Sequence, residues 1–418
     1  MINDKNRHSW CVNAFHGMSG NNDGSTKMCC MIDKEYYRMG LKNPIISLKE
    51  NTDYFLDKKS IKENFDNIFA QNIRQNLERG VRDSACTKCW QEEDGGRKSK
   101  RQRDNEKYEH LLQHGGQPFE GLAIFELNLG NTCNIKCRTC HPTISSQWMK
   151  EDYDLNHKNN STYKQYSENM KKFHRAYDDE SIFWTDLEKN LSTIRQFDFY
   201  GGEPFLSKKM WEILKACVDQ EYAKQIELHY NTNGTTWPKE ADLFKNFKSV
   251  NLSFSIDGIG ERFEYMRHGA KWDEVKENMR IANEYRKDFS KMEICWCITL
   301  STLNIFYLEE TLEEFRKNFS DFGLYLNLVH GPQHFNISFI PEPIKTKVIE
   351  RLKSIDKIHN HAWNYLPGII GFIQNGIPDR KLWNEFLAVV EKHDEYRQQN
   401  FRNSFPDFGK LIDDSILE

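Results

Sequence analysis

The chain has 418 residues, a formal net charge of -4 and 13% aromatic residues. This length accommodates two or three domains, and the aromatic content argues against wholesale disorder although the mean hydropathy is -0.78. The small charge gives no global attraction to nucleic acid or an anionic membrane. The polar amino terminus has no signal-like apolar segment, and the longest apolar stretch, residues 366–373, is too short to cross a bilayer. We therefore expect a globular cytoplasmic protein without a membrane partner.

Five of the eleven cysteines lie in the first hundred residues. They are Cys11, Cys29, Cys30, Cys86 and Cys89. Disulfide frameworks belong to small secreted chains, whereas this chain is long and lacks a secretion signal. Reduced thiols that hold a metal are therefore the better explanation. Spacing alone does not separate an iron–sulfur centre from a structural zinc site at these cysteines.

A short basic run, residues 95–103, follows these cysteines. Such a run can grip a phosphate backbone, but without interleaved aromatic residues it is more typical of a solvated linker or the start of a helix. We therefore expect no nucleic-acid partner. Glycines and a proline around Gly116 then interrupt any regular element, which predicts a first domain of residues 1–116.

The central part of the chain alternates strand-like and helical segments, which predicts βαβ units and a parallel sheet. The expected strands are residues 122–129, 195–200, 226–231, 250–256, 293–300 and 324–329. Six such units predict an open (β/α)6 barrel. Several strands alternate apolar and polar residues instead of being apolar throughout, so the lumen should hold water or a polar ligand. In barrels of this kind the chemistry lies at the carboxyl ends of the strands.

The last seventy residues are predicted to be helical, over 346–359 and 379–400. Three aromatic residues follow at helical spacing, Phe401, Phe405 and Phe408. We expect them to pack on the core, with a substrate lid as the alternative. The predicted organisation is thus an α/β fold with a cysteine-rich domain at 1–116, a barrel at 117–345 and a helical extension at 346–418.

Three cysteines follow the first central strand within eight residues, Cys133, Cys137 and Cys140. On one loop they can converge on an iron–sulfur cube and leave its fourth iron without a protein ligand. Electron carriers usually hold all four irons with cysteine, so an open iron suggests a cluster that binds a substrate or cofactor. CxxxCxxC after a strand resembles the radical S-adenosylmethionine (SAM) enzymes, in which the open iron chelates the amino and carboxylate groups of SAM.

Further motifs follow successive strands in the order that this family has. They are Gly201, Gly202, Glu203 and Pro204 after the second strand, Asn233 after the third, Ser255 and Asp257 at the fourth, and Arg267 ten residues later. The resemblance implies that Glu203 accepts hydrogen bonds from the SAM amino group. It also implies that Ser255 and Asp257 face SAM hydroxyls or the carboxylate, and that Arg267 pairs with the SAM carboxylate. Each motif alone would fit a turn or a surface ion pair.

The amino-terminal cysteines resemble the auxiliary-cluster module called twitch, a shortened SPASM domain, here placed before the barrel. The resemblance implies a second, fully cysteine-ligated [4Fe–4S] cluster that relays electrons. We predict Cys11, Cys29, Cys86 and Cys89 as its ligands, with Cys30 as the alternate to Cys29.

The resemblance implies an enzyme that cleaves SAM reductively to a 5′-deoxyadenosyl radical, with a low-potential electron donor such as flavodoxin or ferredoxin. Twitch and SPASM modules accompany modification of peptides, proteins or small molecules, and we favour a peptide or protein substrate. The alternatives are a nucleotide, sugar or nucleic acid. A non-catalytic iron–sulfur or zinc protein is the hypothesis from another class. No residue is predicted as the catalytic group for the substrate reaction.

Overall fold

The computed structural model of the protein describes residues 7–32, 54–94, 98–109, 121–329, 331–355 and 364–416. The chain forms two compact units. The first comprises Met1–Thr132, Lys164–Tyr230 and Glu240–Val250, and the second comprises Cys133–Tyr163, Asn231–Lys239 and Asn251–Glu418. The boundary expected near Gly116 lies outside the described residues.

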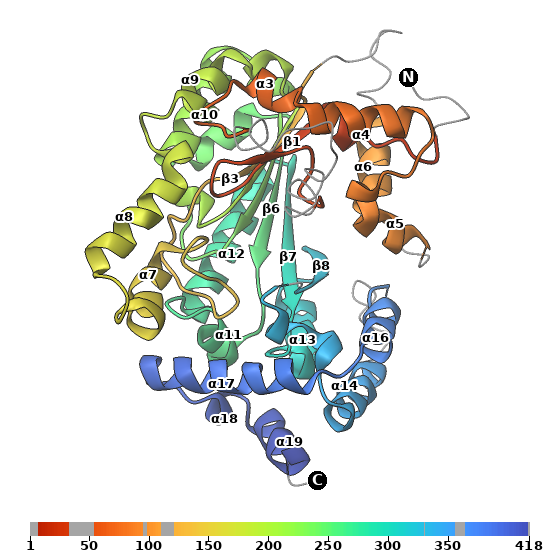
Figure 1. The fold of residues 1–418 in the computed structure, drawn as a ribbon, viewed down its shortest axis with the longest axis vertical. Helices are drawn as coiled ribbons and strands as arrows, with labels where there is room; N and C mark the ends of the chain where they lie inside the picture. Colours follow the sequence, from red (N-terminus) through yellow and green to blue (C-terminus); the bar gives the residue numbers. More distant parts are fainter. Residues whose placement is uncertain are drawn as a thin grey trace. The chain divides into compact units, whose positions relative to one another are not determined.

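The first unit contains five strands in the order β2-β1-β3-β4-β5 (Figure 1). Their bounds are β1 Gly17–Gly20, β2 Thr26–Lys27, β3 Ile124–Asn128, β4 Gln196–Tyr200 and β5 Glu227–Thr232, of which residues 227–230 belong to this unit. Strands β1, β3, β4 and β5 pair in parallel, whereas β2 is antiparallel to β1. The parallel order places the carboxyl ends of β3 and β4 at one edge, where two candidate motifs begin.

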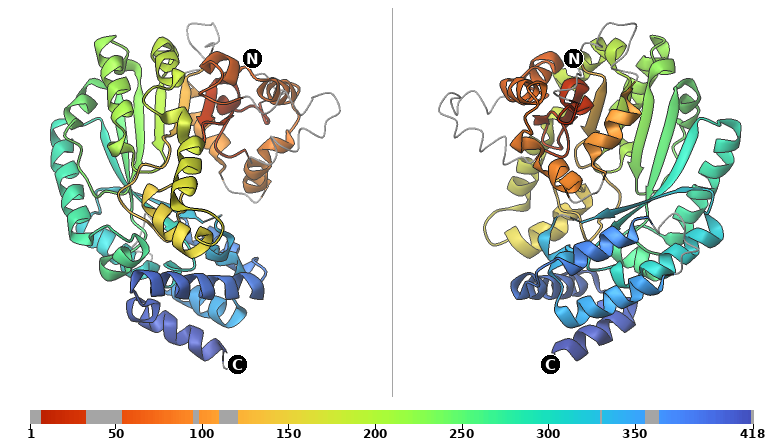
Figure 2. Two further views of the ribbon diagram at one scale, coloured as in Figure 1. Left: turned by 60° about the vertical axis from the view of Figure 1, so that its left-hand side comes forward. Right: turned by 90° about the vertical axis from the view of Figure 1, so that its right-hand side faces the viewer.

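Several helices of the first unit begin at capping residues. Ser60 and Glu63 form a capping box at the start of α3, and Asn67 accepts from Ala70 N at the start of α4. The α-helices are α1 Val12–His16, α3 Ile61–Phe65, α4 Ile68–Glu78, α5 Thr87–Asp94, α6 Lys100–Lys107, α8 Tyr163–His174, α9 Ile182–Lys189 and α10 Lys208–Asp219. Helix α9 lies against α3 and α10 (Figures 1 and 2).

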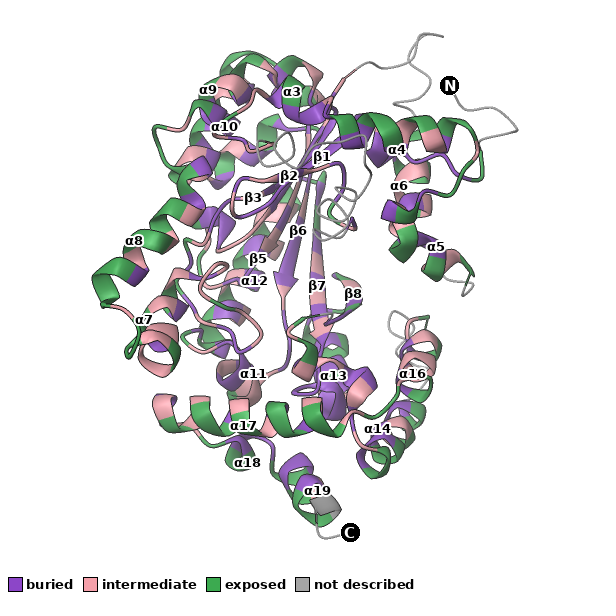
Figure 3. Ribbon diagram, in the orientation of Figure 1, coloured by how far each residue is buried: buried purple, intermediate pink, exposed green. Residues whose placement is uncertain are grey.

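The second unit contains strands in the order β6-β7-β8, with β7 and β8 parallel. The strand bounds are β6 Ser249–Ser255, β7 Met292–Leu300 and β8 Gly323–Leu328. The α-helices are α7 Met149–Asp152, α11 Gly260–Met266, α12 Trp272–Asp288, α13 Leu308–Asn318, α14 Glu342–Ser354, α16 Leu366–Gln374, α17 Arg380–Arg397, α18 Phe401–Ser404 and α19 Pro406–Ile416. Apolar residues of β6 and β7 are buried, as the purple segments of Figure 3 show.

All six predicted strands are present as β3 to β8, each displaced by no more than a few residues from its expected bounds. The predicted α/β fold with a parallel sheet and a helical carboxyl-terminal region is therefore confirmed. Strands β1 and β2 were not predicted, because the Gly-Met-Ser-Gly segment of β1 has neither the alternation nor the β-branched residues that mark a strand.

The carboxyl-terminal aromatic residues pack as expected. Phe401, Phe405 and Phe408 are buried, and Phe405 contacts Tyr265 of α11 edge to face. Pro406 is the first residue of α19, a position at which its missing N–H costs no helical hydrogen bond. Helices α17, α18 and α19 lie together at one end of the second unit (Figure 2). Within the described ranges, no helix combines the length and apolar character needed to cross a bilayer.

Candidate functional site

The three core cysteines lie on one loop of the second unit. Cys133 and Cys137 are buried, and Cys140 is half-buried. Cys140 N donates to Cys137 O at 3.0 Å, and a hydrogen bond between the two thiols lowers the pKa of Cys137 and raises that of Cys140. Trp148 Nε1 donates to Cys137 O at 2.8 Å. The loop thus holds these thiols together without a disulfide, as a metal centre requires.

Arg267 connects this loop with the motif after β6. It follows α11, and its Nη2 lies 2.8 Å from Asp257 Oδ2 while its Nη1 lies 3.8 Å from Cys137 Sγ. Burial alone would lower the pKa of Arg267, but the charges of Asp257 and of Cys137 raise it overall. The Nε atom of Arg267 is buried and has no hydrogen-bond partner in the described part of the chain. One donor of this guanidinium therefore remains for an acceptor that the chain does not provide.

Asp257 is fixed at the end of β6 by two further contacts. Its Oδ1 accepts from Thr299 N at 3.0 Å, and its carbonyl oxygen accepts from Asn304 Nδ2 at 2.9 Å. Ser255, the last residue of β6, is half-buried two residues earlier.

Asn233 reaches the same cysteine loop from the segment after β5. Its Nδ2 lies 3.8 Å from Cys133 Sγ and donates to Asn134 Oδ1 at 2.9 Å. The second unit therefore brings together six predicted residues, Cys133, Cys137, Cys140, Asn233, Asp257 and Arg267.

The Gly-Gly-Glu-Pro motif belongs to the first unit, after β4. Gly201 and Gly202 have φ angles of 78° and 51°, and a Cβ at Gly202 would lie 2.1 Å from Thr132 O. Only glycine fits this close approach. Glu203 is buried, its N–H donates to Thr132 O at 2.8 Å, and Pro204 starts a 3-10 turn. Because Thr132 directly precedes Cys133, the motif is tied to the segment that leads into the cysteine loop.

The amino-terminal cysteines gather in the first unit. Cys11 and Cys29 lie in a buried cluster with Trp90, and Cys86 packs against it. Burial and, to a smaller degree, the Cys89 thiol raise the pKa of Cys11 to about 12. Burial and the neighbouring Cys11 and Cys89 thiols also raise the pKa of Cys86. Such thiols stay protonated unless a metal centre stabilises their ionised form.

Cys30, whose thiol hydrogen-bonds with that of Cys29, also contacts Glu126. Its N–H donates to Glu126 Oε2 at 2.9 Å and its thiol donates to Glu126 Oε1 at 3.2 Å. Glu126, on β3, also lies 3.0 Å from Lys100 Nζ of α6. The ligand atoms of Cys29, Cys30 and Glu126 all lie within 4.8 Å of one another. Sequence reasoning did not identify Glu126, and it considered Lys100 only as part of the basic run at residues 95–103.

Sequence reasoning also did not identify a second titratable pair on the same sheet, Asp198 and His229. Strand register places Glu126 beside Asp198 of β4, and Asp198 beside His229 of β5. His229 Nδ1 lies 3.5 Å from Asp198 Oδ1. Burial would raise the pKa of Asp198, but its hydrogen bond with His229 holds that pKa below its ordinary value. The period-two alternation of β3 and β4 could have revealed this polar face.

Three side chains of the basic run pair with carboxylates of the chain. Lys98 pairs with Glu106, Lys100 pairs with Asp104 and Glu126, and Arg101 pairs with Glu93. Arg97 lies outside the described residues.

Comparison with known proteins identifies the class of the central region. Residues 127–322 match the family model described as the radical SAM superfamily. The match covers less than half of the chain and shows a radical SAM domain in this central region, a domain that implies a [4Fe–4S] cluster and SAM. No curated protein matches the chain.

The solved structures that are similar to this chain include the following three. Native anSMEcpe with bound AdoMet is 16% identical, with 62% of this chain and 64% of that chain covered and a TM-score of 0.35. Streptococcus suis SuiB bound to S-adenosylmethionine is 12% identical, with 74% and 63% covered and a TM-score of 0.36. Streptococcus suis SuiB bound to precursor peptide SuiA is 12% identical, with 78% and 64% covered and a TM-score of 0.34. The chain spans less than two thirds of the length of each of these proteins.

Proposed function

We propose that the enzyme cleaves SAM reductively, with a cluster held by Cys133, Cys137 and Cys140, and uses the resulting radical to modify a substrate. The observation that carries this proposal is the buried guanidinium of Arg267, which joins Asp257 to Cys137 and keeps its Nε unpaired. Three converging soft thiolate ligands and an unsatisfied buried donor fit a cluster with an anionic cofactor beside it. When bound, the cluster supplies the electron that converts SAM to methionine and a 5′-deoxyadenosyl radical.

The chain's own residues orient the cofactor and exclude water. Arg267 would hold the SAM carboxylate through its unpaired Nε, and Asp257 fixes the guanidinium plane. The resemblance implies that Glu203 would accept from the SAM ammonium group, a role suited to a buried carboxylate because little water competes. Asn233 donates toward Cys133 and so orients that ligand. Ser255 offers a hydroxyl to the SAM ribose or carboxylate. The glycine turn at Gly201 and Gly202 lets the backbone approach closely, and Pro204 fixes its exit.

A second part of the proposal is an auxiliary [4Fe–4S] cluster at Cys11, Cys29, Cys86 and Cys89. Mutual burial of these thiols and their raised pKa values support a shared metal centre. The contacts of Cys30 with Glu126 support Cys29 as the ligand, because Cys30 already donates to a carboxylate. Full cysteine ligation suits an electron relay rather than SAM binding. We propose three functional parts, an auxiliary module at residues 1–116, a core at 117–345 and an extension at 346–418.

The substrate we favour is a peptide or protein, because twitch-like modules accompany such chemistry. The polar sheet face with Glu126, Asp198 and His229 is suited to polar groups of a substrate. The internal pairing of Lys100 and Arg101 weakens the support for a nucleic-acid substrate. A nucleotide or sugar is the second candidate. A cytoplasmic location and reduction by flavodoxin or ferredoxin complete the proposal.

SAM binding to anaerobically reconstituted protein tests the core of this proposal. Arg267→Gln removes a charge-assisted donor of about 1.5–3 kcal/mol, so we expect SAM affinity to fall at least about tenfold. Arg262→Gln is the matched control, because Arg262 lies on α11 but pairs with Glu310. Equal affinity in both variants would contradict the role of Arg267. If the wild-type protein binds no SAM, the alternative hypothesis of a non-catalytic iron–sulfur or zinc protein is supported instead.

Metal analysis tests the auxiliary cluster separately. The proposal requires about eight irons per chain, falling to about four when Cys86 and Cys89 are both replaced by Ala. The SAM-perturbed EPR signal should remain in that variant. About four irons with one zinc in the wild-type protein would instead assign a structural zinc site to this module.

A further inference from the structure

The end of helix α17 contacts the segment that carries the core cysteines. Asp394 pairs with Arg138, next to Cys137, and accepts from Tyr265 Oη at 2.7 Å. His393 Nδ1 lies 2.6 Å from Glu151 Oε1, and Lys136 Nζ lies 2.7 Å from Glu151 Oε2. Helix α17 lies outside the residues that match the radical SAM model.

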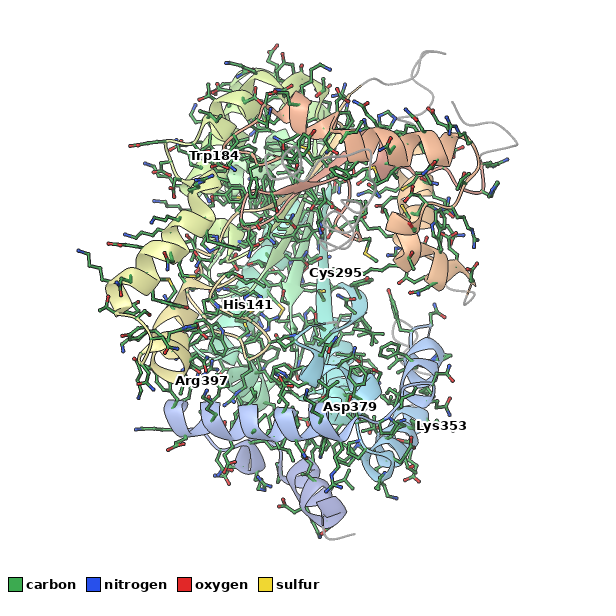
Figure 4. The ribbon with its side chains drawn as sticks, viewed as in Figure 1. His141, Trp184, Cys295, Lys353, Asp379 and Arg397 are labelled. Atoms are coloured by element: carbon green, nitrogen blue, oxygen red, sulfur yellow. The ribbon has the colours of Figure 1, made fainter. Side chains whose placement is uncertain are left out.

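Arg397, labelled in Figure 4, is the last residue of α17. Its side chain is fully buried, with 0% exposed. Its Nε donates to both oxygens of Glu151, at 2.9 and 3.0 Å. The guanidinium lies over the ring of Trp148 at 4.6 Å, and Trp148 in turn donates to Cys137 O. Two contacts therefore separate Arg397 from the cysteine loop.

The other end of this guanidinium has no partner. Both Nη1 and Nη2 are buried and lack a hydrogen-bond acceptor among the described residues. Glu151 is shared with Lys136 and His393, so one carboxylate faces three cationic or potentially cationic groups. A buried, under-compensated cation with unused donors is costly unless an anionic acceptor completes it.

The cysteine loop provides the chemistry of such an acceptor when it is loaded. A cube held by three thiolates carries net negative charge, which increases on reduction. Hydrogen bonds to its sulfur atoms and nearby positive charge favour the reduced form and raise the reduction potential. Opposite charge also explains why Cys137 raises the pKa of Arg397 while burial, the largest effect, lowers it.

We propose that the buried positive charge of Arg397, two contacts away from Cys137, raises the reduction potential of the cluster that the cysteine loop would hold. The carboxyl-terminal helix is then a built-in support for the redox centre, with Glu151 as the residue that positions Arg397. This proposal rests on the proposed cluster at Cys133, Cys137 and Cys140.

An EPR-monitored redox titration of the reconstituted full chain tests it, in a variant with Cys86 and Cys89 replaced by Ala so that one cluster is observed. Arg397→Gln should make the midpoint potential more negative, with about a tenfold smaller ratio of reduced to oxidised cluster, or about 59 mV for one electron. Arg397→Lys keeps the positive charge but loses the planar guanidinium, so it should shift the midpoint potential less. Arg402→Gln, an exposed arginine of α18 paired with Asp413, should leave it unchanged.

The titration is done with and without SAM to distinguish the cluster from the SAM carboxylate as the anion with which Arg397 interacts. A shift already present without SAM supports the cluster as acceptor. An unchanged potential together with weaker SAM binding would assign Arg397 to the SAM carboxylate and overturn the proposal. If Arg397→Gln folds poorly, the Glu151→Gln, Arg397→Gln double variant removes both partners and should show the same negative shift; no shift there also overturns it. Absence of any cluster at Cys133, Cys137 and Cys140 would instead refute the proposed function.

Discussion

Replacing Glu151 by Gln should loosen helix α17 strongly. The Glu151 side chain is fully buried, with 0% exposed, and it contacts Arg397, His393 and Lys136. Burial would raise its pKa, but the hydrogen bond from His393 and the charge of Arg397 lower the pKa of Glu151 to about 2 from an ordinary 4.5. That difference corresponds to about 3 kcal/mol of stability at neutral pH. Leaving one partner of a buried ion pair uncompensated costs about 3–5 kcal/mol, a similar magnitude.

Hydrogen exchange of the α17 amides at pH 7 measures this effect locally, without assuming that the whole chain unfolds in one step. A loss of about 3 kcal/mol increases the opening equilibrium by more than about 100-fold. Glu395→Gln is the matched control, because Glu395 is an exposed glutamate on the same helix. If Glu151→Gln exchanges no faster than Glu395→Gln, the ion-pair argument is wrong.

Three more predictions concern pH, the glycine turn and the asparagine after β5. Because the folded pKa of Glu151 is depressed, its stabilisation should persist above about pH 4.5 and disappear as pH falls toward about 2; acid titration of α17 exchange in metal-free protein would detect this. Gly202→Ala should lower the Tm by several degrees because its Cβ meets Thr132 O, whereas Gly331→Ala, with open space around it, should not. Asn233→Ala should speed iron loss in air because Cys133 loses a donor, whereas exposed Asn246→Ala should match wild type.

Much of the fold follows from local pattern. The alternation in residues 250–256 predicts β6. The sequence pattern did not predict strand β1 because two of its four residues are glycine. The stability of this strand comes from pairing with β3, more than a hundred residues away. Long-range pairing of this kind leaves no periodic trace in a four-residue segment.

The sequence also predicts the candidate site only in part, because local spacing identifies some residues and long-range packing determines the others. Spacing identifies Cys133, Cys137 and Cys140 as a group, but it does not reveal that Arg267 already pairs with Asp257. Arg397 lies on a helix whose sequence has no metal-binding motif, and only packing brings it to the loop. Tertiary contacts of single charged residues depend on where distant helices dock, which local sequence does not encode.

The central claim is that Cys133, Cys137 and Cys140 hold a cluster that cleaves SAM. The most direct measurement is release of 5′-deoxyadenosine by anaerobically reconstituted protein after addition of dithionite and SAM. The account predicts release by the wild type and by the Cys86→Ala, Cys89→Ala variant, and none when the three core cysteines are changed to Ala. Release that persists without those three cysteines would contradict it.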